Sequence, residues 1–519
     1  MSPTGRPSVR WRLPTLLGLL GTLVAATGSW IPSLWGDEGT SVLSAQRSWP
    51  SLLRMVQHVD AVHAVYYAAL HLWVDCFGAS PSSVRFPSAI AAGAATAAVV
   101  VLVRELADAR LALLAGVLCC TLPRITYAGE EARSYAASAA LAGWTLWVLV
   151  RLVTGRSHGR RWWVAYAALV TVSVWLFLFS ALLIAVHLVV VVAARPGRRF
   201  ATRWAATVAV VLVLVAPIAV AGAAERGQIA FLAHRTTVTF RSVTVGLWFS
   251  DTWYAVVAWG LVVVAVAVAV ARWRSRPRDA GRPVAGRPDG GRVDTGAGTR
   301  TLPSVSLTVL AAAWLLVPLV LLLAADAVHP VFSGRYLTSS APAAAVLMAL
   351  GIRHLGAAAR RPAATAVVGA VLVTALAAPV WAQQRGPYAK NDSDWAVISA
   401  TVGAHARPGD AIVFDEGTRP SRDPRLALHT YPEGFRAVRD VTLETPYQER
   451  DTWRDAAWTP AEAAARGRFS GVTRVWLVEY AIDGRADRYG GADLERLGFH
   501  AVRVFRGHRS TITGYERAG

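Results

Sequence analysis

The stretch LPTLLGLLGTLVAATGSWIPSLWGDEG (residues 13–39), close to the N-terminus, indicates the architecture of the whole chain. Residues 13–35 carry no charge and are numerous enough to cross the roughly 30 Å of hydrocarbon in a bilayer. Two adjacent carboxylates, Asp37 and Glu38, follow where this apolar segment would meet water. Acidic residues stabilise helix N-termini, so a capping role is one explanation for the pair.

Apolar segments of similar length recur along most of the chain. The chain has 519 residues, of which 54% are hydrophobic, and 21 are Trp. Up to about residue 383 the apolar residues form runs of roughly 20, the length of a membrane-spanning helix. We therefore predict an all-α polytopic membrane domain over residues 1–383. Its eleven predicted spans lie near residues 13–35, 85–103, 110–127, 135–153, 162–177, 179–194, 204–222, 252–271, 303–324, 337–355 and 362–383.

Basic residues orient these spans. The formal net charge is +20, and Arg clusters occur in every second loop of the predicted topology. Cytoplasmic loops of membrane proteins carry such an excess, so the charge requires no nucleic-acid partner and we exclude one. Lys390 is the only Lys, a bias typical of a GC-rich genome. Eleven spans put the N-terminus in the cytoplasm and the C-terminus outside it.

Three segments differ in composition from the spans. Residues 36–84 repeat apolar residues at helical spacing, which predicts amphipathic helices along the outer membrane interface. Residues 272–302 are rich in Gly, Pro and Arg and predict a disordered cytoplasmic linker. Residues 384–519 predict a small extracytoplasmic α/β domain. Its expected elements are a helix over 393–406 and strands over 410–414, 474–480, 500–507 and 510–517.

Polar residues on the predicted outer side gather in four places, each at or near the end of a span. They are the pair Asp37–Glu38; HVDAVHAVYYAALHLW (58–73), with Asp60, His63, Tyr66 and Tyr67; ITYAGEEARSYAASAAL (125–141), with Glu130, Glu131, Arg133 and Tyr135; and HPVFSGRYLTSSAPA (329–343), with His329, Arg335 and Tyr336.

The order of these motifs resembles a known group of enzymes. An Asp-Glu pair follows the first span, Asp-x-x-His-x-x-Tyr-Tyr comes next, RFPS (85–88) opens span two, and EARSY (131–135) opens span four. This order is similar to that of the polyprenyl-phosphate-sugar-dependent glycosyltransferases of the GT-C fold. Within them it resembles the bacterial family 39 group, akin to protein O-mannosyltransferases and the lipid A aminoarabinose transferase. The resemblance implies a GT-C-like membrane fold and transfer with inversion from a polyprenyl-phosphate donor. It also implies that the chain lies in a bacterial plasma membrane.

The chemistry of such a transfer assigns roles to the outer residues. The phosphate leaving group carries its own negative charge, so the reaction needs a base for the acceptor hydroxyl and cations for the phosphate. We predict Asp37 or Glu38 as the base and Arg133 and Arg335 as the phosphate-binding residues, because Arg forks bind phosphate bidentately. The substrate contacts that we predict are Asp60, His63, Tyr67, Glu131, Tyr135 and Tyr336.

Each of these residues also has a structural explanation. Glu130, Glu131 and Arg133 could form exposed ion pairs worth under ~1 kcal/mol. Arg85 could extend to the lipid head groups, which for this residue we favour over catalysis. His63 could be a structural hydrogen-bonding group. The tyrosines could belong to an interfacial aromatic belt. Carboxylates such as Asp37 and Glu38 also suit Mg²⁺ or Mn²⁺, although the sequence does not require a metal.

The sequence therefore predicts a membrane glycosyltransferase, moving mannose or a related sugar to an acceptor outside the cytoplasm. The acceptor could be a protein, a glycolipid or a polysaccharide. One rival is a transporter or flippase of lipid-linked sugar, which would carry ionisable residues near mid-span, whereas here they lie at span ends. The other rival is a non-catalytic relative whose outer domain binds a glycan or a partner.

Overall fold

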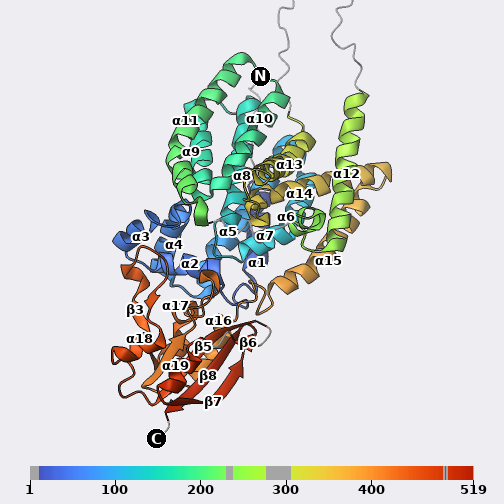
Figure 1. Ribbon diagram of the computed structural model, residues 1–519. Helices are drawn as coiled ribbons and strands as arrows, with labels where there is room; N and C mark the ends of the chain where they lie inside the picture. The colour runs from blue at the N-terminus through green and yellow to red at the C-terminus, as the bar shows by residue number, and fades with distance from the viewer. Residues whose placement is uncertain (1–10, 229–237, 276–304, 483–484, 487–488, 518–519) are drawn as a thin grey trace, which may run out of the picture.

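The computed structural model describes residues 11–228, 238–275, 305–482, 485–486 and 489–517. Figure 1 shows two parts, a bundle of long helices and a smaller unit that contains the strands. Helices α2, α3 and α4 lie at the end of the bundle that faces the smaller unit. Most of the linker predicted over 272–302 falls outside the described residues; helix α12 ends at Arg274.

The bundle contains twelve of the described helices. They are α1 (Arg12–Ala26), α5 (Pro81–Leu106), α6 (Ala109–Cys120), α7 (Pro123–Gly129), α8 (Tyr135–Val153), α9 (Arg160–Leu176), α10 (Leu183–Ala194), α11 (Arg198–Ala224), α12 (Thr252–Arg274), α13 (Leu307–Asp326), α14 (Ala341–Ala358) and α15 (Pro362–Gln384).

The chain is a multi-pass membrane protein, but the structure does not confirm eleven spans. Seven of the described helices are long and apolar enough to cross a membrane, or eight if α6 and α7, which meet at 58°, form one bent span. Helix α1 has 15 residues and extends only about 22 Å. The remainder of its predicted span, residues 27–35, is not helical. Composition misplaced this end because Leu34 and Trp35 are buried by protein and not by lipid.

Small residues bring α1 and α5 into close contact. An added Cβ at Gly93 on α5 would collide with the Gly18 carbonyl and with Thr22, both on α1. Membrane helices associate through such small residues because lipid provides no hydrophobic driving force between helices. This packing fixes the end of α1, from which the chain continues to Asp37.

The segment 36–84, which is predicted to lie on the outer side, forms α2 (Gly36–Ala45), α3 (Trp49–Val56) and α4 (Ala64–Phe77). Helix α3 is amphipathic as predicted, since Leu52 and Met55 are buried while Arg54 is exposed. Helix α2 differs from the expected interfacial helix, because nine of its ten residues are buried. It packs against α4 on the bundle side and against α17 (Leu426–Thr430) of the smaller unit.

The smaller unit is built on a mixed sheet in the order β2-β1-β5-β8-β7. Strand β1 is parallel to β2 and β5, whereas β8 is antiparallel to β5 and β7. Helix α16 (Trp395–His405) covers one face. Helices α18 (Pro460–Ala465) and α19 (Gly491–Arg496) cover the other. The strands are β1 (Asp410–Phe414), β2 (Val438–Asp440), β5 (Arg474–Ile482), β7 (Phe499–Arg506) and β8 (Ser510–Arg517), with β6 (Arg485–Ala486) beside β5 and the pair β3 (Leu443–Thr445) and β4 (Ala456–Ala457) apart.

The predicted small α/β domain is therefore present, and its four predicted strands and its helix lie where the sequence indicated. The three-residue strand β2 was not predicted, because so short a run has no periodic pattern to detect. The domain boundary at residues 383 and 384 stays a prediction; α15 ends at Gln384 and α16 begins at Trp395.

Buried hydrogen bonds fasten the smaller unit to the segment around α2. Arg47, which is 1% exposed, donates to the carbonyls of Tyr447, Arg450 and Thr452. The Leu34 N–H donates to the Tyr431 hydroxyl at 2.8 Å. A buried guanidinium with carbonyl partners is costly to separate from them. The smaller unit is thus packed onto the segment that contains Asp37.

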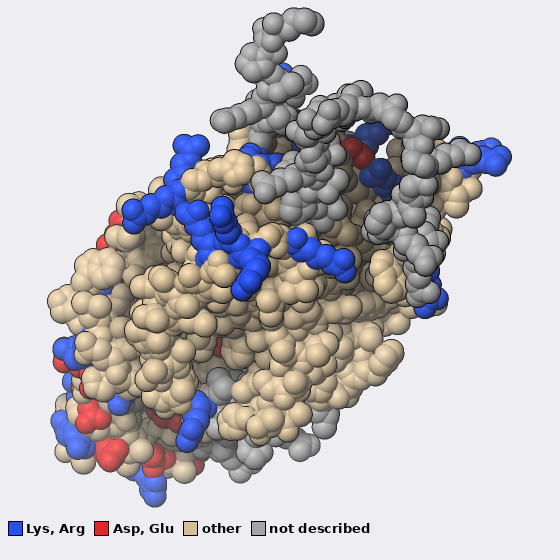
Figure 2. Space-filling model, turned by 90° about the horizontal axis from the view of Figure 1, so that it is seen from above, with Lys and Arg blue, Asp and Glu red and all other residues tan. Residues whose placement is uncertain are grey.

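The opposite end of the bundle is basic. Helices α9 and α11 begin at Arg160 and Arg198, and α12 ends at Arg274, at the end away from the strands in Figure 1. Figure 2 shows basic side chains, which are arginines, gathered on the face seen from that side. This distribution agrees with the predicted orientation, in which this face is cytoplasmic. The orientation itself stays a prediction.

Candidate active site

Asp37 lies in the first turn of α2, and Arg335 approaches it from η5 (Gly334–Ser340), the turn that precedes α14. The Arg335 Nη1 donates to Asp37 Oδ2. Both side chains remain about one quarter exposed, at 25% for Asp37 and 24% for Arg335. The Arg335 guanidinium also lies 5.2 Å from the centre of the Trp35 ring and 6.0 Å from that of Tyr135.

Arg133 reaches the same carboxylate residue from the turn between α7 and α8. Its Nη1 donates to the Asp37 carbonyl and to Ser41 Oγ, each at 3.3 Å. Its Nη2 lies 2.9 Å from His63 Nε2. Two guanidinium groups, from sequence positions about two hundred residues apart, therefore meet at the start of α2.

Three further predicted residues lie beside Arg133. His63 ends the turn η1 (Ala61–His63), and Asp60 precedes this turn in the left-handed region, with φ of 58°. The Tyr67 hydroxyl on α4 donates to Asp60 Oδ2 at 3.0 Å. A left-handed aspartate is strained, and such strain persists where surrounding contacts hold it. The Asp-x-x-His-x-x-Tyr-Tyr motif is thus one connected group next to Asp37.

Burial and charge set the protonation of these groups. Burial alone would raise the pKa of Asp37. The positive charges of Arg335 and then of Arg133 outweigh this effect, so the pKa of Asp37 lies below the usual 3.8. Burial, together with the charge of Arg133, holds the pKa of His63 well below its usual 6.5. His63 is therefore neutral at pH 7, and its Nε2 accepts the hydrogen bond from Arg133. Burial raises the pKa of Asp60 above its usual value.

Glu131 and two tyrosines complete the predicted set. Glu131 is 1% exposed, and its Oε1 has no hydrogen-bond partner among the described residues. Burial raises its pKa above 4.5, against the lowering by Lys390 and Arg335. Tyr336 stacks on Phe179 at 4.3 Å between ring centres, and Tyr135 meets Phe177 edge-on at 5.4 Å. These two tyrosines form an aromatic wall within the protein.

Glu38 has a different environment from Asp37. Its Oε1 accepts from Arg85 Nε at 2.7 Å and from the Ala132 N–H at 2.9 Å, and its Oε2 accepts from Arg85 Nη2. Arg85 also donates to the carbonyls of Ser29 and Pro32, and both ionic side chains are 0% exposed. The interpretation of Arg85 as a residue that extends to lipid head groups is wrong, because the carboxylate of Glu38 holds it inside the protein.

A second buried ionic cluster was not foreseen from the sequence. Lys390 Nζ lies 3.3 Å from Glu130 Oε1 and 3.4 Å from the centre of the Tyr127 ring, and Arg385 Nη1 lies 3.2 Å from Glu130 Oε2. The exposed-ion-pair explanation is wrong, since Glu130 is 0% exposed. The one signal in the sequence was Lys390 itself, a single lysine in a chain that otherwise uses Arg.

The two carboxylates at the start of α2 do not fit a divalent cation. Both Glu38 oxygens are engaged by Arg85, and Asp37 Oδ2 by Arg335. A metal would have to displace these cations and would face their repulsion. Across the described ranges, no group of three or more His, Cys, Asp or Glu side chains could hold a metal ion.

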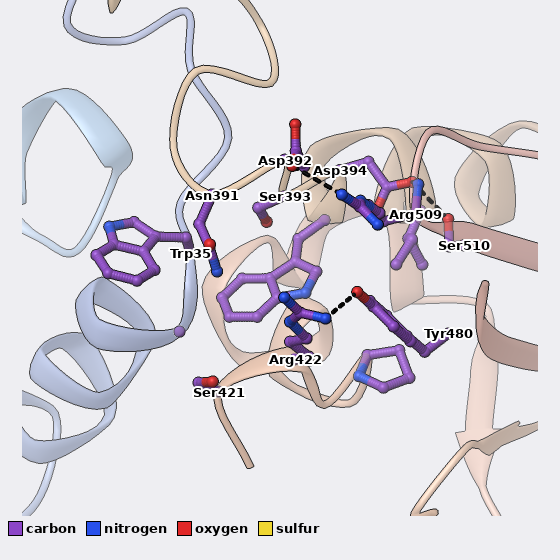
Figure 3. A pocket seen from close by; sticks show the side chains of 14 residues that line it. Trp35, Asn391, Asp392, Ser393, Asp394, Ser421, Arg422, Tyr480, Arg509 and Ser510 are labelled. Atoms are coloured by element: carbon purple, nitrogen blue, oxygen red, sulfur yellow. Dashed lines mark hydrogen bonds and ion pairs between the residues drawn. The ribbon is translucent and has the colours of Figure 1, made fainter. Parts of the chain in front are cut away.

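A small pocket lies beside the site, where Trp35 and Gly36 meet the smaller unit (Figure 3). In its wall Arg422 Nη1 donates to the Tyr480 hydroxyl at 2.8 Å. The cavity volume is about 20 Å³, enough for a water molecule and too small for a sugar. An added Cβ on Gly36 would collide with the backbone of Ser421. The smaller unit therefore packs closely against the residue that precedes Asp37.

Comparison with solved structures identifies the fold of the chain. The crystal structure of ArnT from Cupriavidus metallidurans in the apo state matches with a TM-score of 0.53 at 14% identity, over 96% of this chain and 97% of that chain. The structure of the same protein bound to undecaprenyl phosphate matches with a TM-score of 0.52, also at 14% identity and the same coverage. The chain has the GT-C fold.

A sequence comparison adds to this structural match. A family model described as dolichyl-phosphate-mannose-protein mannosyltransferase matches residues 64–221. This range contains Tyr67 and the EARSY motif with Glu131 and Arg133. No curated protein matches the chain in sequence. The resemblance to GT-C glycosyltransferases that the motif order indicated is confirmed.

Proposed function

We propose that the chain is a membrane glycosyltransferase that moves a sugar from a polyprenyl-phosphate donor to a hydroxyl group of an acceptor outside the cytoplasm, with inversion. The observation that carries this proposal is the approach of two guanidinium groups, Arg335 and Arg133, to Asp37. The GT-C fold supports it. The family description favours mannose as the sugar, and the ArnT complex favours a lipid phosphate as the donor.

Asp37 acts as the general base in this proposal. The acceptor oxygen attacks the anomeric carbon while its proton passes to an Asp37 carboxylate oxygen. The bond between that carbon and the phosphate oxygen breaks, and its electron pair stays on the phosphate, where Arg133 and Arg335 stabilise the charge. Glu38 is the less suitable base, because Arg85 and the Ala132 N–H occupy its oxygens.

Because Asp37 is paired with Arg335, binding of the donor would also change the pKa of Asp37. In the protein as described, Arg335 and Arg133 hold the pKa of Asp37 below 3.8, which makes it a weak base. A donor phosphate that takes up these guanidinium groups removes part of that stabilisation, so the pKa of Asp37 rises. A base becomes more effective as its pKa approaches the working pH. The donor phosphate thus strengthens the base that the transfer needs.

The remaining predicted residues would contact the sugar and the acceptor. Asp60, His63 and Tyr67 form a group held by hydrogen bonds beside Arg133. The unpartnered Glu131 Oε1 can accept a hydrogen bond from a sugar hydroxyl, which would relieve the cost of its burial. Tyr135 and Tyr336 present ring faces and hydroxyls near Arg335, a combination suited to a sugar ring.

The test uses membranes that carry the protein and radiolabelled polyprenyl-phosphate-mannose. We expect label to pass from the lipid to an acceptor in wild-type membranes and to stay on the lipid in Asp37→Asn membranes. Parallel donors with other sugars identify the sugar. Movement of the donor between the two leaflets, without loss of label from the lipid, would contradict the transferase and indicate a flippase.

A further inference from the structure

The smaller unit, called the outer domain from here on because it is predicted to lie outside the cytoplasm, contains a hollow. This hollow is well separated in sequence from the residues of the proposed active site. It lies beyond the C-terminal end of α16, over the sheet, and has a volume of about 520 Å³. Ligand pockets usually measure about 300–1,000 Å³, so the hollow is large enough for a few sugar residues. Its lining is mostly polar and comes from the turn after α16 and from β5, β7 and β8.

The hollow exists because two features leave part of the sheet face uncovered. Helix α16, which covers this face, ends at His405, and Ala406 is already extended. On β8, Gly514 lies between its cross-strand neighbours Trp476 and Arg503 and carries no side chain to fill the space. An added Cβ at Gly514 would meet the Trp476 ring at 3.2 Å. Any larger residue at this position would intrude into the hollow.

A β-bulge directs Arg503 into this space. The pairing of β7 with β8 shifts between Ala501 and Arg503, so that Arg503 and not Val502 faces Gly514. Because side chains alternate along a strand, Arg503 then shares its sheet face with Phe505, which packs beneath α16. Bulges reorient side chains in this way and are common next to binding sites. Without the bulge, Val502 would occupy this position.

Two arginines at the hollow are free to bind a ligand. Arg474 is paired with Glu516 at 3.3 Å and lies 3.6 Å from Asp410, so its charge is compensated. Arg407, from the turn after α16, and Arg503 are exposed. Within the described residues, neither of these two side chains has a hydrogen-bond or ion-pair partner. The hollow therefore has two uncompensated guanidinium groups.

We propose that this hollow binds an acidic saccharide chain, with Arg407 and Arg503 holding its carboxylate or phosphate groups. Guanidinium forks match both anions bidentately, and the polar lining suits sugar hydroxyls. The inference rests on the proposed function only in naming this saccharide as the acceptor. The binding itself needs no transfer reaction. The outer domain then holds the acceptor chain away from the membrane while its growing end reaches Asp37.

Binding of acidic and neutral polymers to the full-length protein tests this proposal. The protein is placed in nanodiscs of phosphatidylcholine, and binding of polygalacturonate, polyphosphate and neutral dextran is measured at several salt concentrations. We expect at least one acidic polymer to bind and dextran not to bind. The carboxylate and phosphate polymers show which anion the site prefers.

Variants connect that binding to the hollow. We expect Arg407→Ala and Arg503→Ala each to weaken it by at least about fivefold, and the double variant to lose it. Arg506→Ala is the matched control, because Arg506 is exposed on the same strand but faces the other side of the sheet. Wild-type affinity in the double variant, equal loss in Arg506→Ala, equal binding of dextran, or no binding of either acidic polymer would each overturn the proposal. If the wild-type protein binds the acidic polymer but transfers no sugar, that result would contradict only the proposed function.

Discussion

Arg335 donates a hydrogen bond to the Asp37 carboxylate across 298 residues of sequence, and this pair stays partly open to solvent. One residue further along α2, Glu38 forms a second ion pair, with Arg85, that is completely buried. Adjacent carboxylates on one helix turn therefore have opposite surroundings. Solvent reaches the first pair, whereas protein encloses the second. This contrast predicts different effects of substitution at the two positions.

Substitution of Asp37 by Asn should remove catalysis and leave the fold intact. The amide keeps the volume but cannot take up the proton, so sugar transfer should fall by at least ~10²-fold, the low end of what a positioned base contributes. Protein yield should match wild type, because the side chain is partly exposed. The matched control is Asp75→Asn, an exposed acid on α4. Wild-type turnover in Asp37→Asn would exclude the base role.

Substitution of Glu38 or Arg85 should destabilise the protein. Glu38→Gln or Arg85→Met leaves one buried charge without its partner, a change that typically costs about 3–5 kcal/mol. Both single variants should unfold at lower temperature in detergent, as followed by Trp fluorescence, while Asp37→Asn unfolds near the wild-type temperature. The double variant should regain part of the loss, because no unpaired charge remains. Single variants as stable as wild type would contradict this assignment.

The pH dependence of transfer should show no titration of His63. Its pKa lies well below 6.5, so it is neutral above that pH, and its Nε2 accepts from Arg133 throughout. Any loss of activity through its protonation is therefore displaced to lower pH than for a free histidine. His63→Gln, which retains an acceptor, should give a kcat/KM profile of the same shape between pH 6 and 8. An acid limb near pH 6.5 that disappears in His63→Gln would show that His63 titrates.

Reporter fusions test the orientation of the chain. If eleven spans place the outer domain outside the cytoplasm, a phosphatase fused after Gly519 should be active and one inserted at Gly290 silent. The basic ends of α9, α11 and α12 support this orientation. A silent phosphatase after Gly519 would mean that one span is miscounted. The first region to revise would then be residues 162–194, which the structure divides into α9, a short turn and α10.

The sequence predicted the helices and strands well where apolar patterns were long. It predicted them less well where residues near a span are buried by other parts of the protein and not by lipid. Residues 27–35 carry no charge and follow directly on an apolar segment, yet the smaller unit and not lipid covers Leu34 and Trp35. Composition does not distinguish these two kinds of burial. The same limit explains α2, whose polar Ser41 and Ser44 are fully buried between two parts of the chain.

Some residues of the candidate site could likewise be predicted from the sequence, and others could not. From the sequence, Asp37 or Glu38 was predicted as the base and Arg133 and Arg335 as the phosphate-binding residues, and the structure brings both arginines to Asp37. The roles of Arg85 and Lys390 depend on which carboxylate lies opposite in space, and no local pattern records that. For Arg85 the available signal was a charge at the start of an apolar segment, since burying it requires a partner. For Lys390 it was the presence of a single lysine in a chain that otherwise uses Arg.

The last prediction concerns Arg133 and Arg335 as joint ligands of the donor phosphate. An ammonium keeps the charge but loses the planar fork, so Arg133→Lys and Arg335→Lys should each raise the donor KM by about tenfold or more, roughly 1.4 kcal/mol. Because both side chains already meet at Asp37, they would share one phosphate, and the double variant should lose less than the sum of the single losses.

Arg54→Lys provides the control for these two variants. Arg54 is half exposed and pairs with Asp451 on the surface, so its replacement should leave the donor KM unchanged. A general effect of Arg-to-Lys replacement would appear in this variant as well. Donor KM values within about twofold of wild type for both Arg133→Lys and Arg335→Lys, far below the ~1.4 kcal/mol of a tenfold change, would remove these residues from the phosphate site. Asp37 would then need another explanation for its two guanidinium neighbours.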